Sequence, residues 1–452
     1  MSLLSNLVRA PAVRIGAFFA ALAAAARLLV IGARAASGGN GPVQDRLKAA
    51  LTAPSSQVSV FAVLRVFAPN IVLGTKFITA YDNSGTAIVT RYEDVKEVLR
   101  RDDDFAVVYE PRMRTITGGN NFFLGMADTP EYTRDTSFMR LAMRREDVET
   151  VIRPFAAARA ADLVGAAVGR IDVPQDLTLR VPAQLVGTYF GTPGPSEQEA
   201  IAWTTIMFWY LFIDLGADPV VIAEATQAAQ QCRDYLDATI RERKAAGVAV
   251  DDVLGRCLAM QQTQTPGSDD LAIRNNLIGL MIGAVPTTSK AAVQALDQLL
   301  DRPDALAGAH QAARDGDDAR LAAYVFEALR FNPVNPLIYR RAIRAATIAR
   351  STLRATTIPA GTMVLAANLS AMFDPLQLAS PNSFRVDRPW DDYILWGDGL
   401  HTCFGAHVNR ALIPTILKPL LAKRGLRRAA GAAGQIDTGG TPFPAHLVVE
   451  FG

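Results

Sequence analysis

The stretch "YILWGDGLHTCFGAHVNRAL", residues 393–412, decides the fold, because it sets one of very few cysteines among glycines and ahead of a helical run. Glycines such as Gly399 and Gly405 permit positive φ angles, or let the backbone approach a flat ligand closely. Cys403 stands at the start of a helix expected near Gly405, where a helix N-terminus favours an anion and lowers the pKa of a thiol. The pattern therefore indicates a thiolate that binds a metal.

The composition narrows the kind of metal site. The 452 residues contain three cysteines and four histidines, which excludes a disulfide framework and most sites built from several histidine ligands. The metal at Cys403 is therefore expected to arrive with its own ligands, as iron does in the four-nitrogen ring of haem. Lysine plus arginine (46) nearly balance aspartate plus glutamate (44), which predicts no nucleic-acid partner. The sparse cysteines indicate a reducing compartment, the cytoplasm.

The order of the predicted elements indicates a mainly α fold with small β-sheets. Residues 76–105 are expected to form two strands, joined by the turn at residues 83–85, and then a helix. Helical periodicity dominates residues 128–330, including a long central helix at 271–300, and short strands return at 338–367. Strands and helices do not alternate, which argues against a doubly wound parallel sheet.

The N-terminal segment allows three interpretations. Residues 15–33, "IGAFFAALAAAARLLVIGA", are long enough to span a bilayer, but a central Arg27 opposes insertion by about 2.5–3.5 kcal/mol. A membrane anchor, a helix on the membrane surface and a soluble helix all stay open. The flexible sequence "SGGNGP" at 37–42 predicts a boundary between an N-terminal segment, 1–44, and a catalytic domain, 45–452.

The spacing Trp396-x-x-Gly399-x-x-x-Cys403-x-Gly405 resembles the cysteine-ligand signature of the cytochrome P450 superfamily, Phe-x-x-Gly-x-x-x-Cys-x-Gly. Tryptophan in place of phenylalanine keeps an aromatic ring near the sulfur. The resemblance implies haem b (iron protoporphyrin IX) with the Cys403 thiolate as axial ligand and with Trp396, Gly399 and Gly405 beside it. It also implies that the haem lies between the long central helix and the helix that follows the cysteine.

Other motifs in the expected order support this resemblance. Glu327 and Arg330, three apart on a helix, resemble the family's Glu-x-x-Arg pair, and Arg388 resembles the arginine that completes a structural triad. The sequence "PAGT" at 359–362 resembles the family's strand turn. The resemblance covers roughly residues 45–452.

Contacts to the haem propionates are also implied by the resemblance. Arg340 and His401 stand where the family places two such donors. The helix usually written Pro-x-His-x-x-x-Arg has Tyr132 in place of histidine. Whether Arg134 or Arg140 reaches a propionate stays open.

The long central helix departs from the family pattern. The family uses an acid and an alcohol there to relay protons to bound oxygen, but this chain has Pro286 at the acid position, followed by Thr287 and Thr288. Proline carries no proton, removes an N–H and kinks a helix. Either oxygen activation proceeds through Thr287, Thr288 and water, or the protein uses a peroxide in place of dioxygen and electrons.

The expected substrate is small and hydrophobic, because apolar aromatic residues fall where the family has its substrate-facing segments. The predicted pocket residues are Phe122, Phe123, Ala284, Pro286 and Phe443.

Three functions follow from the resemblance. The first is a monooxygenase with a ferredoxin-like or flavin reductase partner, the second is a hydroperoxide isomerase or peroxygenase, and the third is a non-catalytic haem-binding sensor. A basic surface near the C-terminus is either the docking site for an acidic electron donor or an ordinary solvated helix face. Its residues are Lys418, Lys423, Arg424, Arg427 and Arg428.

Overall fold

The chain divides into two compact units. The structure, a computed structural model, describes residues 3–38 and 41–452; part of the predicted linker, residues 39–40, lies outside them. The predicted boundary at residues 44 and 45 stays a prediction. The first unit comprises Met1–Phe77, Asp82–Ala106 and Arg330–Leu400, and the second comprises Ile78–Tyr81, Val107–Leu329 and His401–Gly452.

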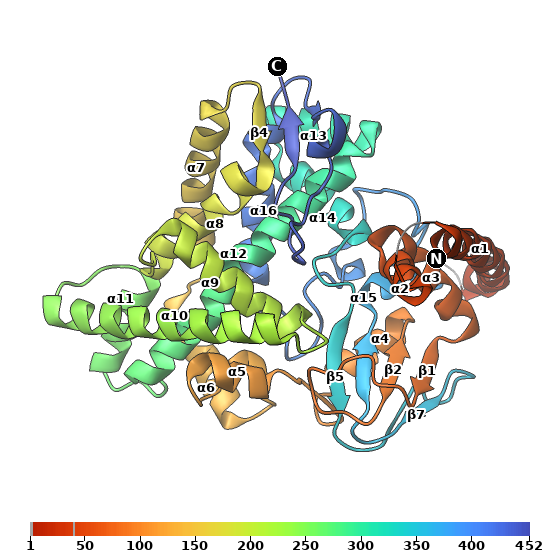
Figure 1. Cartoon of the computed structure of the whole chain (residues 1–452), viewed down its shortest axis with the longest axis horizontal. Coiled ribbons are helices and arrows are strands. Elements are labelled where there is room, and N and C mark those ends of the chain that lie inside the picture. The colour runs from red at the N-terminus through yellow and green to blue at the C-terminus, as the bar shows by residue number, and fades with distance from the viewer. Residues whose placement is uncertain (1–2, 39–40) are drawn as a thin grey trace. The chain divides into compact units, whose positions relative to one another are not determined.

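A five-stranded sheet organises the first unit, in the order β1-β2-β8-β5-β3 (Figure 1). Strands β2 and β8 run parallel and the other pairs are antiparallel. The strands are β1 (Asn70–Leu73), β2 (Thr86–Val89), β3 (Phe105–Ala106), β5 (Ile338–Ala342) and β8 (Met363–Ala366), and a separate antiparallel pair is formed by β6 (Ala346–Ile348) and β7 (Thr356–Ile358). Helices α4 (Tyr92–Arg100) and α15 (Asn368–Ala371) and the short turn η6 (Trp390–Asp392) belong to the same unit.

One predicted strand is wrong. Strand β2 and the following helix α4 are confirmed, but the partner of β2 is β1, which begins at Asn70, ahead of the predicted segment. In the second unit, Thr79 and Ala80 instead donate their backbone N–H groups to the Leu215 carbonyl, at 2.9 and 3.1 Å. The β-branched pattern around Ile78 thus reflects burial of this short segment and not a sheet register.

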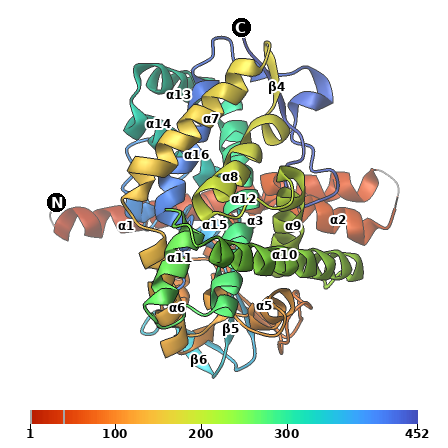
Figure 2. The same cartoon turned by 90° about the vertical axis from the view of Figure 1, so that its left-hand side faces the viewer.

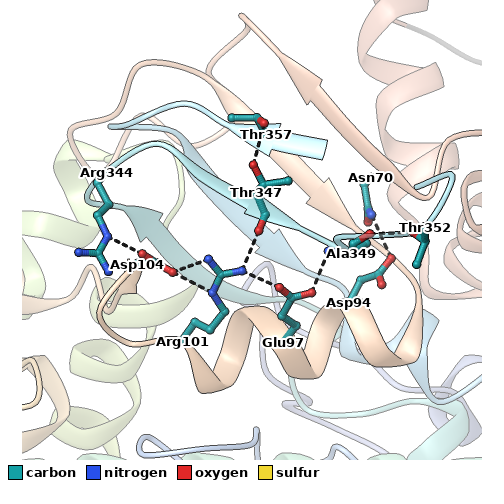
Figure 3. A network of polar contacts seen from close by, with 10 residues as sticks. All are labelled: Asn70, Asp94, Glu97, Arg101, Asp104, Arg344, Thr347, Ala349, Thr352 and Thr357. Atoms are coloured by element: carbon teal, nitrogen blue, oxygen red, sulfur yellow. Dashed lines mark hydrogen bonds and ion pairs between the residues drawn. The ribbon is translucent and has the colours of Figure 1, made fainter. Parts of the chain in front are cut away.

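A polar network ties α4 to the strands of the first unit (Figure 3). The Arg101 guanidinium donates to Asp104, Glu97 and the Thr347 carbonyl, and Arg344 donates to the other oxygen of Asp104. Burial opposes ionisation of Asp104, but the hydrogen bonds from Arg344 and Arg101 outweigh it and lower its pKa. The network holds the start of β6 against the end of α4.

The N-terminal segment forms helices α1 (Leu3–Ser37), α2 (Val43–Thr52) and α3 (Pro54–Phe67). Helix α1 packs on α3 through Phe18 and Phe67, whose ring centroids lie 5.7 Å apart, and it buries Ala21 and Ala24. Within the described residues, Pro11–Ser37 is long and apolar enough to cross a membrane by length and composition alone. A signal sequence passes the same test, so this observation decides among the three interpretations only weakly.

Helices dominate the second unit, as predicted, and α12 runs through it against α8, α9, α10, α13 and α16 (Figure 2). The helices are α5 (Glu110–Thr117), α6 (Pro130–Ala142), α7 (Arg153–Ala166), α8 (Arg180–Leu185), α9 (Glu197–Phe208), α10 (Pro219–Ala246), α11 (Val253–Gln262), α12 (Asp270–Leu300), α13 (Pro303–Asp315) and α16 (Ala406–Leu421). Helix α14 (Asp318–Phe331) continues from the second unit into the first.

Short elements close the second unit. A three-stranded sheet has the order β4-β10-β9, and single turns of π or 3₁₀ helix join several helices. These elements are β4 (Arg170–Asp172), β9 (Arg427–Arg428), β10 (Val448–Glu450), η1 (Phe123–Gly125), η2 (Val148–Ile152), η3 (Val173–Thr178), η4 (Val186–Phe190), η5 (Trp209–Ile213) and η7 (Gly431–Gly434).

The predicted long central helix is confirmed as α12. Its N-cap residue Asp269 accepts a hydrogen bond from the Ala272 N–H at 2.9 Å, which satisfies one free donor of the first turn. The helix continues past Pro286, although this residue has no N–H to donate to the Ile282 carbonyl. Tertiary packing therefore maintains the helix even though proline at position 286 disfavours it.

Candidate functional site

Cys403 lies just before α16, as predicted, and Gly405 caps that helix. The Ala406 N–H donates to the Cys403 carbonyl at 3.1 Å. Burial raises the pKa of the Cys403 thiol, and the backbone N–H groups of Gly405 and Ala406 only partly oppose this. The expected lowering of this pKa by the helix N-terminus is present, because both N–H groups favour the thiolate, but desolvation outweighs it. Coordination to a metal deprotonates a thiol outright.

The Cys403 side chain is nevertheless accessible, and so is one face of α12. Gly283, Ala284 and Thr287 are each half-buried, whereas the neighbouring residues Val285, Pro286 and Thr288 are buried. A methyl group added at Gly283 or at Gly405 would meet nothing within 4 Å. Open space therefore borders both helices where a flat ligand is expected.

The donor set fits a metal that brings its own ligands. Among residues 3–38 and 41–452, no group of three or more histidine, cysteine, aspartate or glutamate side chains could hold a metal ion. The Cys403 thiol is a single soft ligand beside open space, which suits haem iron and does not suit a zinc site with four protein ligands.

Two side-chain hydrogen bonds fix α12 inside the second unit. The Thr288 hydroxyl donates to Asn409 Oδ1 on α16 at 3.0 Å, and the hydroxyls of Thr178 and Ser289 are 2.8 Å apart. Thr288 is fully buried. The long helix and the cysteine helix are thus tied directly to each other. No pattern in the sequence predicts this role of Asn409.

The Thr287 hydroxyl donates to the carbonyl of Gly283 one turn earlier in α12. Its oxygen can still accept a hydrogen bond, because a hydroxyl has two lone pairs. Pro286 occupies the neighbouring position with no titratable group. The structure therefore brings Thr287 to the accessible face and leaves it without an adjacent carboxylate.

Aromatic residues predicted for the pocket pack around the same region of the second unit. Phe123 lies 5.1 Å from Phe404, the residue after Cys403, and 6.1 Å from Phe122. A side chain at Gly279 would collide with the Phe122 ring, so glycine is required there for the ring to lie against α12. Phe122 and Phe123 are both buried, as a pocket wall or a core would require.

Three of the predicted propionate contacts cluster beside the cysteine. The rings of Tyr132 and His401 lie 5.3 Å apart, and the Arg140 guanidinium lies 6.0 Å from the Phe404 ring. Arg134 instead pairs with Asp135 at 2.7 Å, which raises its pKa. Of the two arginines that the sequence left open, the structure brings Arg140 and not Arg134 to the cysteine loop.

The remaining predicted residues lie in the first unit. Trp396 stacks on Trp390 with centroids 5.3 Å apart. Gly399 has a φ of +75°, and a Cβ there would come within 2.5 Å of the Leu99 carbonyl, so glycine is required. Arg340 is buried in β5 and donates to the Tyr339 carbonyl at 3.0 Å.

The predicted triad is buried throughout. Glu327 and Arg330 are fully buried, and Arg388 nearly so. In the first unit, Arg330 and Arg388 both donate to the Ser383 carbonyl, at 3.3 and 2.9 Å, and Arg330 also donates to Met372 at 3.0 Å. The two arginines therefore organise the backbone that precedes the cysteine loop, which agrees with a structural role.

The basic surface expected near the C-terminus is largely neutralised. Carboxylates pair with Lys418 (Asp318, 2.6 Å), Arg427 (Glu450, 2.9 Å) and Arg428 (Asp297 and Asp301, 2.7 Å). Among the described residues, Arg424 alone of the five shows neither an ion pair nor a ring contact. The solvated-face interpretation therefore fits better than a docking surface for an acidic partner.

Comparisons with known proteins identify the family of this chain. A sequence model described as Cytochrome P450 matches residues 77–422. The chain belongs to the cytochrome P450 family. It is thus a haem-thiolate oxidoreductase whose cofactor is haem b, with a cysteine thiolate as axial ligand.

Individual relatives are distant. The cyclomarin C epoxidase CymV of Salinispora arenicola (strain CNS-205) is 27% identical over 303 residues, which cover 66% of this chain and 73% of that protein. The mycinamicin IV hydroxylase/epoxidase of Micromonospora griseorubida is 28% identical over 359 residues, covering 74% of this chain and 81% of that one. The ligand-free structure of cytochrome P450 TbtJ1 matches with a TM-score of 0.71 at 21% identity, over 89% of this chain and 98% of that one. This last likeness confirms the fold alone.

Proposed function

We propose that this P450 is a monooxygenase that inserts one oxygen atom of O2 into a hydrophobic substrate. The other oxygen atom leaves as water, with two electrons from a reductase and two protons from solvent. The observation that carries the proposal is the accessible Cys403 thiol in the same unit as the bare Gly283–Thr287 face of α12. Two P450 relatives that are an epoxidase and a hydroxylase/epoxidase support it.

The roles of the residues follow from their match to the family's motifs. Cys403 is the axial thiolate, flanked by Trp396, Gly399 and Gly405. The propionates are held by Arg340, His401, Tyr132 and Arg140, with Arg134 kept from that role by Asp135. When bound, haem with a thiolate ligand supplies oxygen activation, and the protein positions the substrate and excludes water.

The two threonines have different roles in this proposal. Thr287 faces the open space and can receive a hydrogen bond from water while its own proton is held by the Gly283 carbonyl. The Thr288 hydroxyl is committed to Asn409. Thr287 is therefore the residue that positions water for proton delivery, and Thr288 positions α12.

A second function is favoured by one observation, the absence of an acid at Pro286. A peroxygenase or hydroperoxide isomerase takes both oxygen and oxidising equivalents from a peroxide, so it needs no proton relay to dioxygen. General acid catalysis contributes about 10²–10⁴-fold, which makes the loss of a carboxylate serious for a monooxygenase and harmless for this alternative.

The electron donor is proposed to dock near Arg144 and Arg145, which follow α6. Both arginines are exposed, as is Leu141 in the last turn of α6. Burial lowers the pKa of His407 on α16, and the nearby charges of Arg145 and Arg140 lower it further. These cations therefore lie close to the start of the cysteine helix, where an acidic ferredoxin-like or flavin partner would deliver electrons.

The proposed location is the cytoplasm, with α1 resting on a membrane surface. One face of α1 exposes apolar side chains, while Ala21 and Ala24 on the opposite face are buried against the first unit. A helix that packs along one face on its own protein unit is better suited to lie at the membrane–water interface than to cross the bilayer. The exposed α1 face consists of Ile15, Phe19, Leu22, Leu29 and Val30.

The decisive experiment combines a spectrum with turnover. The purified protein is reduced under carbon monoxide, and product formation is then compared with reductase plus O2 and with peroxide alone. A thiolate-type carbonyl spectrum and strict dependence on donor and O2 are expected. Cys403→Ser should abolish that spectrum, whereas Cys257→Ser, at a buried thiol of α11 whose pKa burial raises to about 12, should preserve it. Turnover with peroxide alone would replace the proposal by the second function.

A further inference from the structure

Lys290 is a charged residue on the bare face of α12. It follows Gly283 by seven residues and Thr287 by three, spacings that place all three side chains on one side of a helix. Like them it keeps partial accessibility, whereas residues 288, 289 and 291–296 are buried. The Lys290 side chain therefore leaves α12 on the same side as Thr287, about one turn further along the helix.

No carboxylate of the described residues forms an ion pair with Lys290. Its amine lies 5.8 Å from the centroid of the Phe443 ring. Burial alone lowers its pKa to about 8. Lys244 and Lys418, in contrast, pair with Asp270 and Asp318 at 2.5 and 2.6 Å.

A row of aromatic rings leads away from this amine. Phe443 lies 5.9 Å from Phe208, which lies 4.6 Å from Phe212, which in turn lies 4.8 Å from Tyr109. The row joins the C-terminal segment, α9, η5 and the start of α5 within the second unit. The Lys290 cation thus lies at the Phe443 end of this apolar row.

We propose that Lys290 binds the carboxylate of the substrate, whose apolar body lies along the aromatic row Phe443–Phe208–Phe212–Tyr109. The substrate class is therefore a carboxylic acid with an extended hydrocarbon body. This proposal rests on the proposed function only in taking the bare face of α12 as the substrate side of the site.

The physical argument concerns partial desolvation. An ammonium group removed from water without a partner is unfavourable, and a ligand carboxylate restores a charge-assisted hydrogen bond. A neutral ligand of the same shape leaves the amine unpaired. A hydrogen bond to a charged group corresponds to about a tenfold to hundredfold difference in affinity, so acids should bind better than their esters by that factor.

The test measures binding without turnover. Octanoic, dodecanoic and hexadecanoic acids and their methyl esters are titrated into the haem-loaded protein at pH 7, by calorimetry and by the change in haem absorption. At least one acid should bind about tenfold or more tightly than its ester. Lys290→Met should remove that preference and leave ester binding unchanged, while Lys290→Arg should keep it.

Lys423 provides a matched control, because its amine lies 5.2 Å from the ring of Phe451 and it is also half-buried. Lys423→Met should leave the preference for acids intact. In the unmodified protein, a bound acid should also protect Lys290, and not Lys423, from reductive methylation followed by peptide mass spectrometry. This second measurement needs no variant and so does not depend on a variant folding.

Equal affinity for acid and ester, no binding of any of the three acids, or an unchanged preference in Lys290→Met would overturn the proposal. Failure of the monooxygenase proposal gives a different result. In that case the binding preference persists, but product forms only with peroxide or not at all.

Discussion

Two substitutions at Pro286 distinguish its effect on proton delivery from its effect on the geometry of α12. Pro286 is buried in α12, and the helix continues on both sides of it. Pro286→Ala restores the N–H that the Ile282 carbonyl lacks and removes the proline ring from the helix interior. Since proline is about 3 kcal/mol less favourable than alanine inside a helix, this variant should be more stable by up to that amount. It supplies no proton and should leave O2-dependent turnover unchanged.

Pro286→Asp adds a carboxyl group next to Thr287. Burial raises the pKa of such a group, while Lys290, four residues later on the same helix, favours its charged form. A carboxyl group balanced in this way can both hold and release a proton near neutral pH. General acid catalysis is typically about 10²–10⁴-fold, so turnover with donor and O2 should rise at least tenfold if proton delivery limits it.

The assay compares product formed per electron consumed for both variants and for Pro286→Asp combined with Lys290→Met. Peroxide-supported turnover serves as the internal control, since it bypasses delivery of protons to dioxygen. The reasoning fails if Pro286→Ala accelerates the reaction as much as Pro286→Asp, because helix geometry would then be limiting. It fails equally if a folded, haem-loaded Pro286→Asp shows no gain.

Four further outcomes are expected. Thr288→Val should lower the free energy of unfolding by about 1–3 kcal/mol in denaturant titrations, because Asn409 on α16 loses its hydrogen-bond donor. The control is Thr415→Val, whose hydroxyl donates only within α16; it should change the free energy of unfolding by less than about 1 kcal/mol. Charge reversal at Arg144 and Arg145 should raise the reductase concentration needed for half-maximal rate and flatten its salt dependence. Only the ammonium form of Lys290 binds a carboxylate. Affinity for dodecanoic acid should therefore fall as the pH rises through about 8, as fluorescence or calorimetric titrations from pH 6 to 9.5 would record. The full chain should sediment with anionic lipid vesicles, and serine substitutions across the exposed α1 face should abolish this.

Most of the fold could be predicted from the sequence because its main signals are local. Apolar periodicity over many turns defines α12, and the glycines around Cys403 define the loop and the start of α16. The strand misplaced near Ile78 shows the limit of such signals. A short apolar run satisfies a strand pattern equally well when its backbone bonds to a single distant carbonyl, here that of Leu215.

The errors at the site share one physical cause: residues distant in sequence change the surroundings of a charged group in the folded chain. The basic run near the C-terminus is charged in sequence, but carboxylates from α12, α14 and β10 meet it in the fold. The Cys403 thiol stands at a helix N-terminus whose N–H groups favour its anion, yet desolvation raises its pKa. Local pattern predicts which groups are present, and only packing determines their charge state.

Lys290 shows the same limit from the opposite side. A lysine within an apolar helix is expected to reach solvent, so the sequence offers no reason to place it beside a substrate. Two facts of packing change this interpretation: the residue shares the accessible face with Gly283 and Thr287, and the group opposite it is an aromatic ring and not a carboxylate. A neutral substrate would not need a cation at this position. A methionine of similar length could pack there, and no charge would then be removed from water. Desolvation of the unpaired Lys290 ammonium group is unfavourable, and a ligand carboxylate that pairs with this group best explains why a lysine is present.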